Sequence, residues 1–93
     1  MIDGRKGRAM LADSLQSLPP ATVFERSSSL ANAAYDESRK LLQIEFRDQS
    51  IYRYAAVPSC AYTELLQAHS KGQYFNAHIR TRYPSVKVRA ALP

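Results

Sequence analysis

The sequence predicts an α+β domain: a small three-stranded antiparallel meander followed by two short helices packed on one face of the sheet. Three observations support this. Residues 42–47 alternate between apolar and polar side chains, residues 51–57 are rich in β-branched and aromatic types, and two stretches with helical spacing follow Pro58. The 93 residues allow one modest core, since folding at this size buries only about 60–65% of the chain's surface.

Three segments can be distinguished along the chain. Residues 1–26 form an N-terminal extension, where leucines at 11, 15 and 18 have the spacing of a short amphipathic helix. A disordered terminus is the alternative for this extension. Residues 27–84 form the folded domain, and residues 85–93 form a basic C-terminal tail.

Three strands are expected in the domain. The first covers residues 30–35, between a run of three serines and a polar turn. The second covers residues 42–47 and the third residues 51–57, where Pro58 ends the sheet. Short polar segments separate the strands, so an antiparallel meander is the simplest arrangement.

The loop between the second and third strands decides which side chains face the core. A three-residue loop over 48–50 places Phe46 opposite Tyr52, makes Tyr54 a core neighbour and turns Arg53 outward. A two-residue loop would reverse every face of the third strand. We favour the longer loop because the shorter one aims Arg53 at the apolar side.

The first helix is expected to begin after Pro58, with Ser59 as its N-cap. Four residues then recur at the spacing of an amphipathic stripe: Tyr62, Leu65, Leu66 and His69. His69, at the end of this helix, is expected to be a rim residue rather than a catalytic base.

The second helix is expected from Lys71 to about residue 82, capped by Ser70 and ended by Pro84. Its predicted core face consists of Gly72, Phe75, Asn76, Ile79 and Tyr83. Beside this face runs a second stripe that mixes cations with an aromatic ring: Lys71, Tyr74, His78 and Arg82.

This stripe is the candidate binding site. Residues 71–93 hold five Lys or Arg and no carboxylate, and the net charge of the whole chain is +5. Cations displace counterions from a nucleic-acid backbone and aromatic rings stack on bases, so the stripe suits RNA, either tRNA or a single strand. Arg80 can add a phosphate contact, and Tyr52 and Arg53 are further candidates. A solvated cationic edge without function is the alternative.

Other classes of function have little support in the sequence. Cys60 is the only cysteine, so no intramolecular disulfide or cysteine-based zinc site can form. The two histidines have no carboxylate between them and no glycine-rich phosphate loop is present. We therefore expect no enzymatic activity, no cofactor and no bound metal. Without a run of 18–20 apolar residues we also expect no membrane association, and a cytoplasmic location.

Several motifs together resemble the KTSC domain family, named after a C-terminal extension of some lysyl-tRNA synthetases and also found as small stand-alone bacterial proteins. The motifs are AAYD at 33–36, LQIEF at 42–46, YRY at 52–54, VP at 57–58 and SKGQYFNAHIRTRYP at 70–84. The family's central tyrosine pair falls on Tyr52 and Tyr54. The chain departs from the family at Gln49, where glycine is usual, and at Ala55 and Ala56, where a bulkier aromatic is common.

The resemblance implies a small α+β domain whose biochemical role is undetermined, with RNA binding suggested by the synthetase association. A protein-interaction module that uses the N-terminal segment or the edge of the sheet is the alternative. No catalytic domain of a synthetase is present in these 93 residues.

Overall fold

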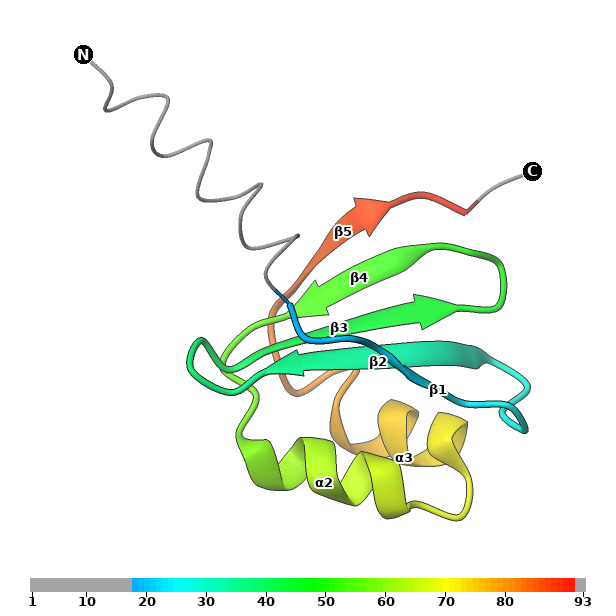
Figure 1. Ribbon diagram of the computed structural model, residues 1–93, viewed down its shortest axis with the longest axis horizontal. Helices are drawn as coiled ribbons and strands as arrows, with labels where there is room; N and C mark the ends of the chain where they lie inside the picture. The colour runs from blue at the N-terminus through cyan, green and yellow to red at the C-terminus, as the bar shows by residue number, and fades with distance from the viewer. Residues whose placement is uncertain (1–17, 92–93) are drawn as a thin grey trace.

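The computed structural model describes residues 18–91, which form five strands and two helices. The predicted three-stranded meander is present as β2 (Leu30–Asp36), β3 (Leu41–Phe46) and β4 (Ile51–Tyr54). Two strands that the sequence did not predict flank it: β1 (Thr22–Val23) and β5 (Ser85–Arg89). Every neighbouring pair is antiparallel, and the strand order follows the chain from β1 to β5 (Figure 1).

The two added strands lie at the edges of the sheet. Strand β1 is only two residues long, too short to give a pattern, yet the next residue, Phe24, is buried and its N–H bonds to the Ala31 carbonyl at 2.9 Å. Strand β5 follows Pro84 and is largely exposed. Its sequence has no pattern of burial, which is why these residues were predicted to be a basic tail. Pairing with β4, rather than burial of side chains, makes residues 85–89 a strand.

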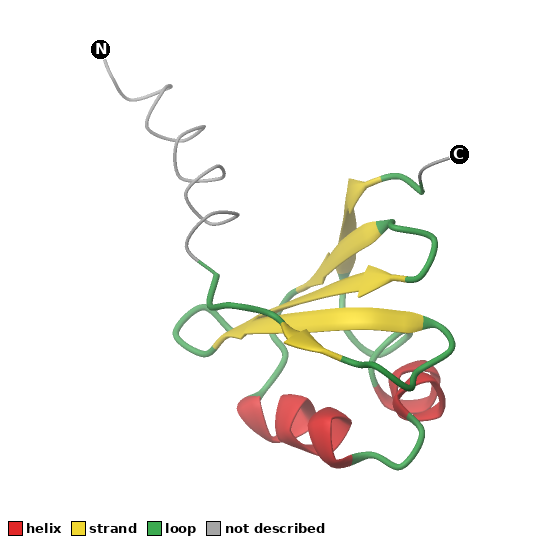
Figure 2. Ribbon diagram, turned by 45° about the vertical axis from the view of Figure 1, so that its right-hand side comes forward, coloured by secondary structure: helices red, strands yellow, loops and turns green. Residues whose placement is uncertain are grey.

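Both helices, α2 (Ser59–Gln67) and α3 (Lys71–His78), lie on one face of the sheet, as predicted (Figure 2). The N-cap of α2 is Pro58 without a side-chain cap, so the predicted cap by Ser59 is wrong. Ser70 does cap α3, because its Oγ accepts a hydrogen bond from the Gln73 N–H at 3.3 Å. Within residues 18–91, no helix has the length and apolar character needed to cross a membrane.

Helix α3 ends at His78, not near residue 82 as predicted. The Ile79 and Arg80 N–H groups both bond to the Phe75 carbonyl at 2.9 Å, so the helix closes in a tight turn. The chain then has only a few residues in which to return to the sheet, where β5 begins at Ser85. The turn of residues 79–84 therefore replaces the last helical turn.

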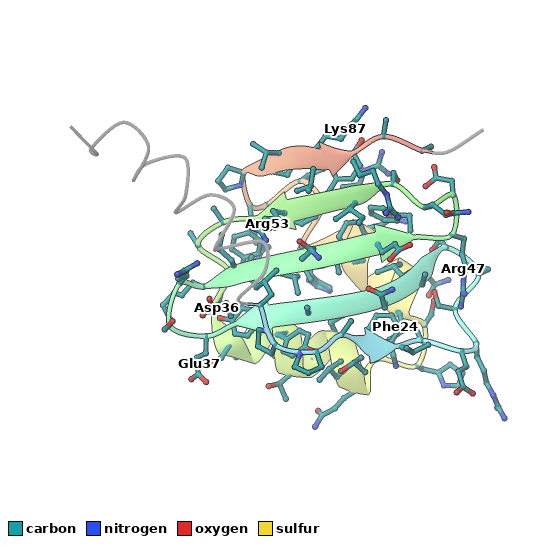
Figure 3. The ribbon with its side chains drawn as sticks, turned by 45° about the horizontal axis from the view of Figure 1, so that its top comes forward. Phe24, Asp36, Glu37, Arg47, Arg53 and Lys87 are labelled. Atoms are coloured by element: carbon teal, nitrogen blue, oxygen red, sulfur yellow. The ribbon has the colours of Figure 1, made fainter. Side chains whose placement is uncertain are left out.

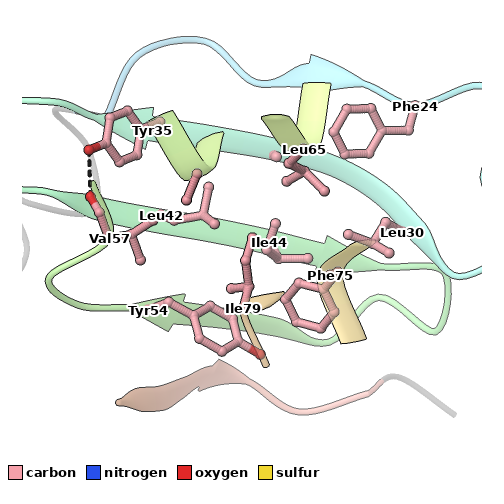
Figure 4. Packing of buried hydrophobic residues seen from close by; sticks show 12 residues of the cluster. Phe24, Leu30, Tyr35, Leu42, Ile44, Tyr54, Val57, Leu65, Phe75 and Ile79 are labelled. Carbon is pink, nitrogen blue, oxygen red and sulfur yellow. Dashed lines mark hydrogen bonds between the residues drawn. The ribbon is translucent and has the colours of Figure 1, made fainter. Parts of the chain in front are cut away.

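The core fills the space between the helices and the sheet (Figure 4). Its centre is formed by residues with no exposed surface: Leu42, Ile44, Val57, Leu65 and Ile79. All nine Phe and Tyr rings of the chain are part of this cluster or pack against it. Within the buried part of this cluster, the Tyr35 hydroxyl donates a 2.6 Å bond to the Val57 carbonyl. The other face of the sheet therefore has no aromatic ring.

The hairpin between β3 and β4 has the predicted faces but a different register. Ile44, not Phe46, lies opposite Tyr52, although Phe46 still contacts that ring edge-on at 5.7 Å. The loop covers residues 47–49, because the Phe46 N–H bonds to the Ser50 carbonyl and draws Ser50 into the ladder. The shift is two residues, so the same side chains face the core.

Candidate functional site

Most of the predicted site residues lie along α3 and the turn after it. Lys71, Tyr74 and His78 are on the helix, while Arg80 and Arg82 are in the turn. The predicted helical stripe is therefore wrong at Arg82, which lies beyond the end of α3. His78, Arg80 and Arg82 are exposed, and Lys71 and Tyr74 are half-buried. The surface accessible to a ligand is therefore concentrated at the C-terminal end of α3.

Tyr74 and His78 form an aromatic pair one helical turn apart. Their ring centroids lie 4.6 Å apart at an angle of 34°. The Tyr74 hydroxyl donates a 2.6 Å hydrogen bond to Oε1 of Glu64 in α2. Burial of the phenol, together with this bond to a carboxylate, raises the pKa of Tyr74 to about 12. Tyr74 is thus fixed against α2 and supports His78, whose ring is the one exposed to solvent.

Lys71 lies at the opposite end of α3 and is held in place. Its Nζ donates a 2.7 Å hydrogen bond to the Ala68 carbonyl and lies 5.7 Å from the centroid of the Phe24 ring. The ammonium group therefore binds the link between the helices. It keeps its charge, but one of its hydrogen-bond donors is already used and the side chain is held away from the end of α3 where Arg80 and Arg82 lie.

Arg80 and Arg82 extend from the turn after α3. Arg80 has one long contact, 3.5 Å from its Nη1 to Oδ1 of Asn76. Neither guanidinium forms an ion pair with any residue in the described range 18–91. No carboxylate follows Glu64 in the sequence. These two arginines are consequently exposed cations beside α3 that an anion could reach.

Tyr52 and Arg53 do not join this surface. Tyr52 is half-buried on the helix side of the sheet, stacked on Tyr54 with a 6.5 Å centroid distance, and Lys87 Nζ lies 5.8 Å from its ring. Arg53 is on the opposite face of the sheet (Figure 3), where it is 7% exposed and its Nε donates to Oε1 of Gln43 at 3.0 Å. Desolvation lowers the pKa of this guanidinium. The predicted additions are therefore separated from α3.

Asn76, predicted to lie on the buried face of α3, is exposed. Phe75 and Ile79 alone hold that face in the core, with 2% and no exposure, and Tyr83 is half-buried beside them. His69 follows the end of α2 and is exposed, in agreement with a rim position. The prediction for Asn76 is therefore wrong: it lies within α3, but only the narrower stripe of Phe75 and Ile79 meets the core.

A groove that the sequence did not predict lies between the segment 22–29 and the start of α3. Its volume is about 960 Å³, and its polar lining includes Arg26, Ser28, Ser29, Gln73 and Asn76. A Cβ atom at Gly72 would lie 2.7 Å from Oγ of Ser29, so the glycine lets the serine loop approach the helix. The run of three serines and this glycine were the only sequence signals for the groove.

Metal-ligating side chains are scattered rather than grouped in the part of the chain that the structure describes. The described residues include no group of three His, Cys, Asp or Glu side chains that could hold a metal ion. Cys60 is exposed on the surface of α2. The site, as far as the structure describes the chain, offers cations, a histidine ring and hydrogen-bonding groups.

Comparison with known proteins shows the family to which this chain belongs. The family model of the KTSC domain matches residues 26–83. The chain belongs to the KTSC domain family. A crystal structure of a KTSC domain protein from Yersinia pestis has the same fold, with a TM-score of 0.71 and 30% sequence identity over 74% of this chain and 96% of that one.

Relatives of the KTSC domain occur in small proteins and in one much larger enzyme. A protein of Stutzerimonas stutzeri is 43% identical over 54 residues, which cover 58% of this chain and 76% of the relative. A protein of Tsukamurella paurometabola is 32% identical over 60 residues, 64% of this chain and 90% of the relative. A lysine–tRNA ligase of Nostoc punctiforme is 36% identical over 56 residues, 60% of this chain but only 10% of the enzyme.

The structure also accounts for one departure from the KTSC pattern. Gln49 occupies a backbone position with φ of 74°, in the left-handed region that glycine enters without strain. Glycine would suit this position, because a three-residue hairpin loop of this kind commonly places one there. Gln49 adopts the same conformation at some energetic cost.

Proposed function

We propose that this KTSC domain is a non-enzymatic RNA-binding module that uses the C-terminal end of α3 and the turn after it. The observation that carries the proposal is the grouping of His78, Arg80 and Arg82, which are all exposed, at a point where no acidic residue follows in the chain. Guanidinium groups bind phosphate, and an exposed histidine ring offers one base a stacking surface.

The relative that is a lysine–tRNA ligase adds support, because an equivalent domain is joined there to an enzyme named for a tRNA substrate. The number of cations limits the expected strength. Two to four phosphate contacts give a salt dependence of only about 2–3 in log affinity per log salt, so binding is expected to be weak at physiological ionic strength.

The test is binding of fluorescently labelled tRNA and of a labelled single-stranded RNA, measured by anisotropy between low and moderate salt. The Arg82→Ala variant should weaken binding and reduce the salt slope by about one. Lys40→Asn is the matched control, because Lys40 is an exposed cation in the β2–β3 turn, outside α3 and the turn after it, and asparagine tolerates its φ of 55°.

The two variants remove the same charge from the protein. An equal effect of both would show non-specific attraction to a basic protein, and no salt-dependent binding of the wild type at low ionic strength would refute RNA binding altogether.

A further inference from the structure

Strand β5 forms the long open edge of the sheet. It pairs with β4 on one side, and on its other side no strand of residues 18–91 pairs with it. The opposite edge, β1, is two residues long and begins one residue after the Pro19–Pro20 pair, so it offers little to a pairing strand. Strand β5 has five residues and is mostly exposed.

The register identifies which backbone groups face outward. The Ala55 N–H bonds to the Pro84 carbonyl at 2.9 Å, so the backbone groups at residue 84 point toward β4. Because these directions alternate along an antiparallel strand, Val86, which lies opposite Arg53, also points its backbone inward. The N–H and C=O of Ser85 and Lys87 therefore face away from the sheet.

The side chains of β5 define the charge of a suitable partner. Arg89 is engaged, with its Nη2 3.2 Å from Oε2 of Glu45 and its Nε bonded to the Gln49 carbonyl at 2.9 Å. Lys87 lies over the Tyr52 ring and has no ion pair among the described residues. Val86, 63% exposed, adds apolar surface on the other face of the strand. A second copy of β5 would place like charges side by side, whereas a carboxylate opposite Lys87 would pair with it.

We propose that the outer edge of β5 binds an extended acidic segment of another protein, which adds to the sheet as a sixth strand. The backbone groups of Ser85 and Lys87 form the hydrogen bonds of the new ladder, and Lys87 selects a carboxylate at the facing position. This surface lies beyond the proposed RNA site on α3 and does not depend on it.

The test uses a blocked seven-residue peptide in which glutamate alternates with valine and threonine. Its control is the same peptide with lysine in place of each glutamate. Titration into the ¹⁵N-labelled full chain should shift the amide signals of residues 85–89, and the lysine peptide should leave them unchanged. Shifts confined to other residues, or equal shifts with both peptides, overturn the proposal.

Two variants distinguish the contribution of the Lys87 backbone N–H to peptide binding from that of its side-chain charge. Lys87→Pro removes the outward N–H without removing a bond to β4, and it should weaken peptide binding by about tenfold or more. Lys87→Thr keeps the N–H and removes the charge, so it should weaken binding only a few-fold. Equal binding by Lys87→Pro and Lys87→Thr overturns the backbone role, and the wild-type titration decides the proposal if Lys87→Pro does not fold.

Other occupants of the edge have distinct signatures. Concentration-dependent dimers in sedimentation without peptide would show that a second copy occupies β5. Loss of RNA binding in both Lys87 variants, with no peptide shifts in the wild type, would assign Lys87 to RNA. Either result overturns the proposal.

Discussion

The Tyr74 hydroxyl in α3 and the Glu64 carboxylate in α2 form a 2.6 Å hydrogen bond that joins the two helices. Burial and this bond favour the neutral phenol and raise its pKa to about 12, against about 10 in an unfolded chain. The resulting stability is fully present below about pH 10 and is lost as the pH rises through about 12.

Replacement of Tyr74 by phenylalanine tests this bond. The Tyr74→Phe variant should lower the free energy of unfolding by about 1 kcal/mol at pH 7, the usual net value of a hydrogen bond. The difference from wild type should shrink between pH 10 and 12, as measured by urea unfolding. Tyr62→Phe is the control, since the Tyr62 hydroxyl has only a 3.4 Å contact to Thr22. Ionisation of Tyr74 near pH 10 in an ultraviolet titration would contradict the prediction.

The exposed ring of His78 is expected to contribute to RNA binding by stacking. Loss of one base–ring stack costs about 1–3 kcal/mol, so His78→Ala should weaken the binding of single-stranded RNA by roughly tenfold. His69→Ala removes the other histidine, which is also exposed, and should leave affinity nearly unchanged. Anisotropy titrations of both variants at one low salt concentration decide the matter, and equal losses would argue against stacking at His78.

The carboxylate of Asp48 closes the β3–β4 loop. Its Oδ1 accepts bonds from the Ser50 hydroxyl at 2.6 Å and the Ser50 N–H at 2.9 Å, which lower the pKa of Asp48. This stabilisation is present above about pH 4 and is lost as the pH falls through the lowered pKa. Asp48→Asn should therefore reduce the melting temperature at pH 7, and the difference should narrow below pH 4.

The control for this pH dependence is Glu37→Gln, which removes an exposed carboxylate from the β2–β3 turn. Its melting temperature should follow that of the wild type across the acid range. A gap between wild type and Asp48→Asn that stays constant down to pH 2 would show that the charge of Asp48 has no part in the loop.

The left-handed backbone at Gln49 predicts a stabilising substitution. Gln49→Gly should raise the free energy of unfolding by about 0.5–1 kcal/mol, because glycine relieves the strain of a φ of 74° at the cost of some chain entropy. The bond from Arg89 goes to the Gln49 carbonyl and survives the change. Gln49→Ala should not raise the free energy of unfolding measured in urea. If it raised this free energy as much as Gln49→Gly, the effect would come from removal of the glutamine side chain and not from relief of backbone strain.

Adjacent positions on α3 should respond very differently to truncation. Phe75 is 2% exposed and contacts the rings of Phe46 and Tyr54 edge-on, so Phe75→Ala should cost about 3–5 kcal/mol. Asn76→Ala removes an exposed side chain and should change stability by less than about 0.5 kcal/mol. Comparable losses in urea unfolding would mean that Asn76 packs into the core after all.

The central strands could be predicted because the order of apolar and polar residues along them indicates which face of the sheet is buried. Residues 42–46 alternate in character, and the aromatic residues of β4 follow the same rule. The register could not be predicted, because a three-residue loop over 47–49 and one over 48–50 turn the same side chains toward the core. The bond from the Phe46 N–H to the Ser50 carbonyl, which selects 47–49, leaves no mark on the sequence pattern.

The remaining features depend on contacts between distant segments. Strand β5 is held by pairing with β4, and its exposed side chains carry no pattern of burial. A helical wheel places the candidate residues along α3, but it cannot show that Glu64 on another helix binds Tyr74 or that Lys71 bonds to Ala68. These ties leave His78, Arg80 and Arg82 as the accessible part of the predicted set.

Strands β4 and β5 are neighbours in the sheet, but both helices lie between them in the sequence. The hairpins β2–β3 and β3–β4 can form once residues up to Tyr54 have left the ribosome, because their loops are short. Strand β5 can pair only after α3 and Pro84 have been made. The turn that carries Arg80 and Arg82 is therefore anchored at both ends only when β5 has paired with β4. A chain that stopped before residue 85 would lack the strand that fixes the C-terminal end of this turn.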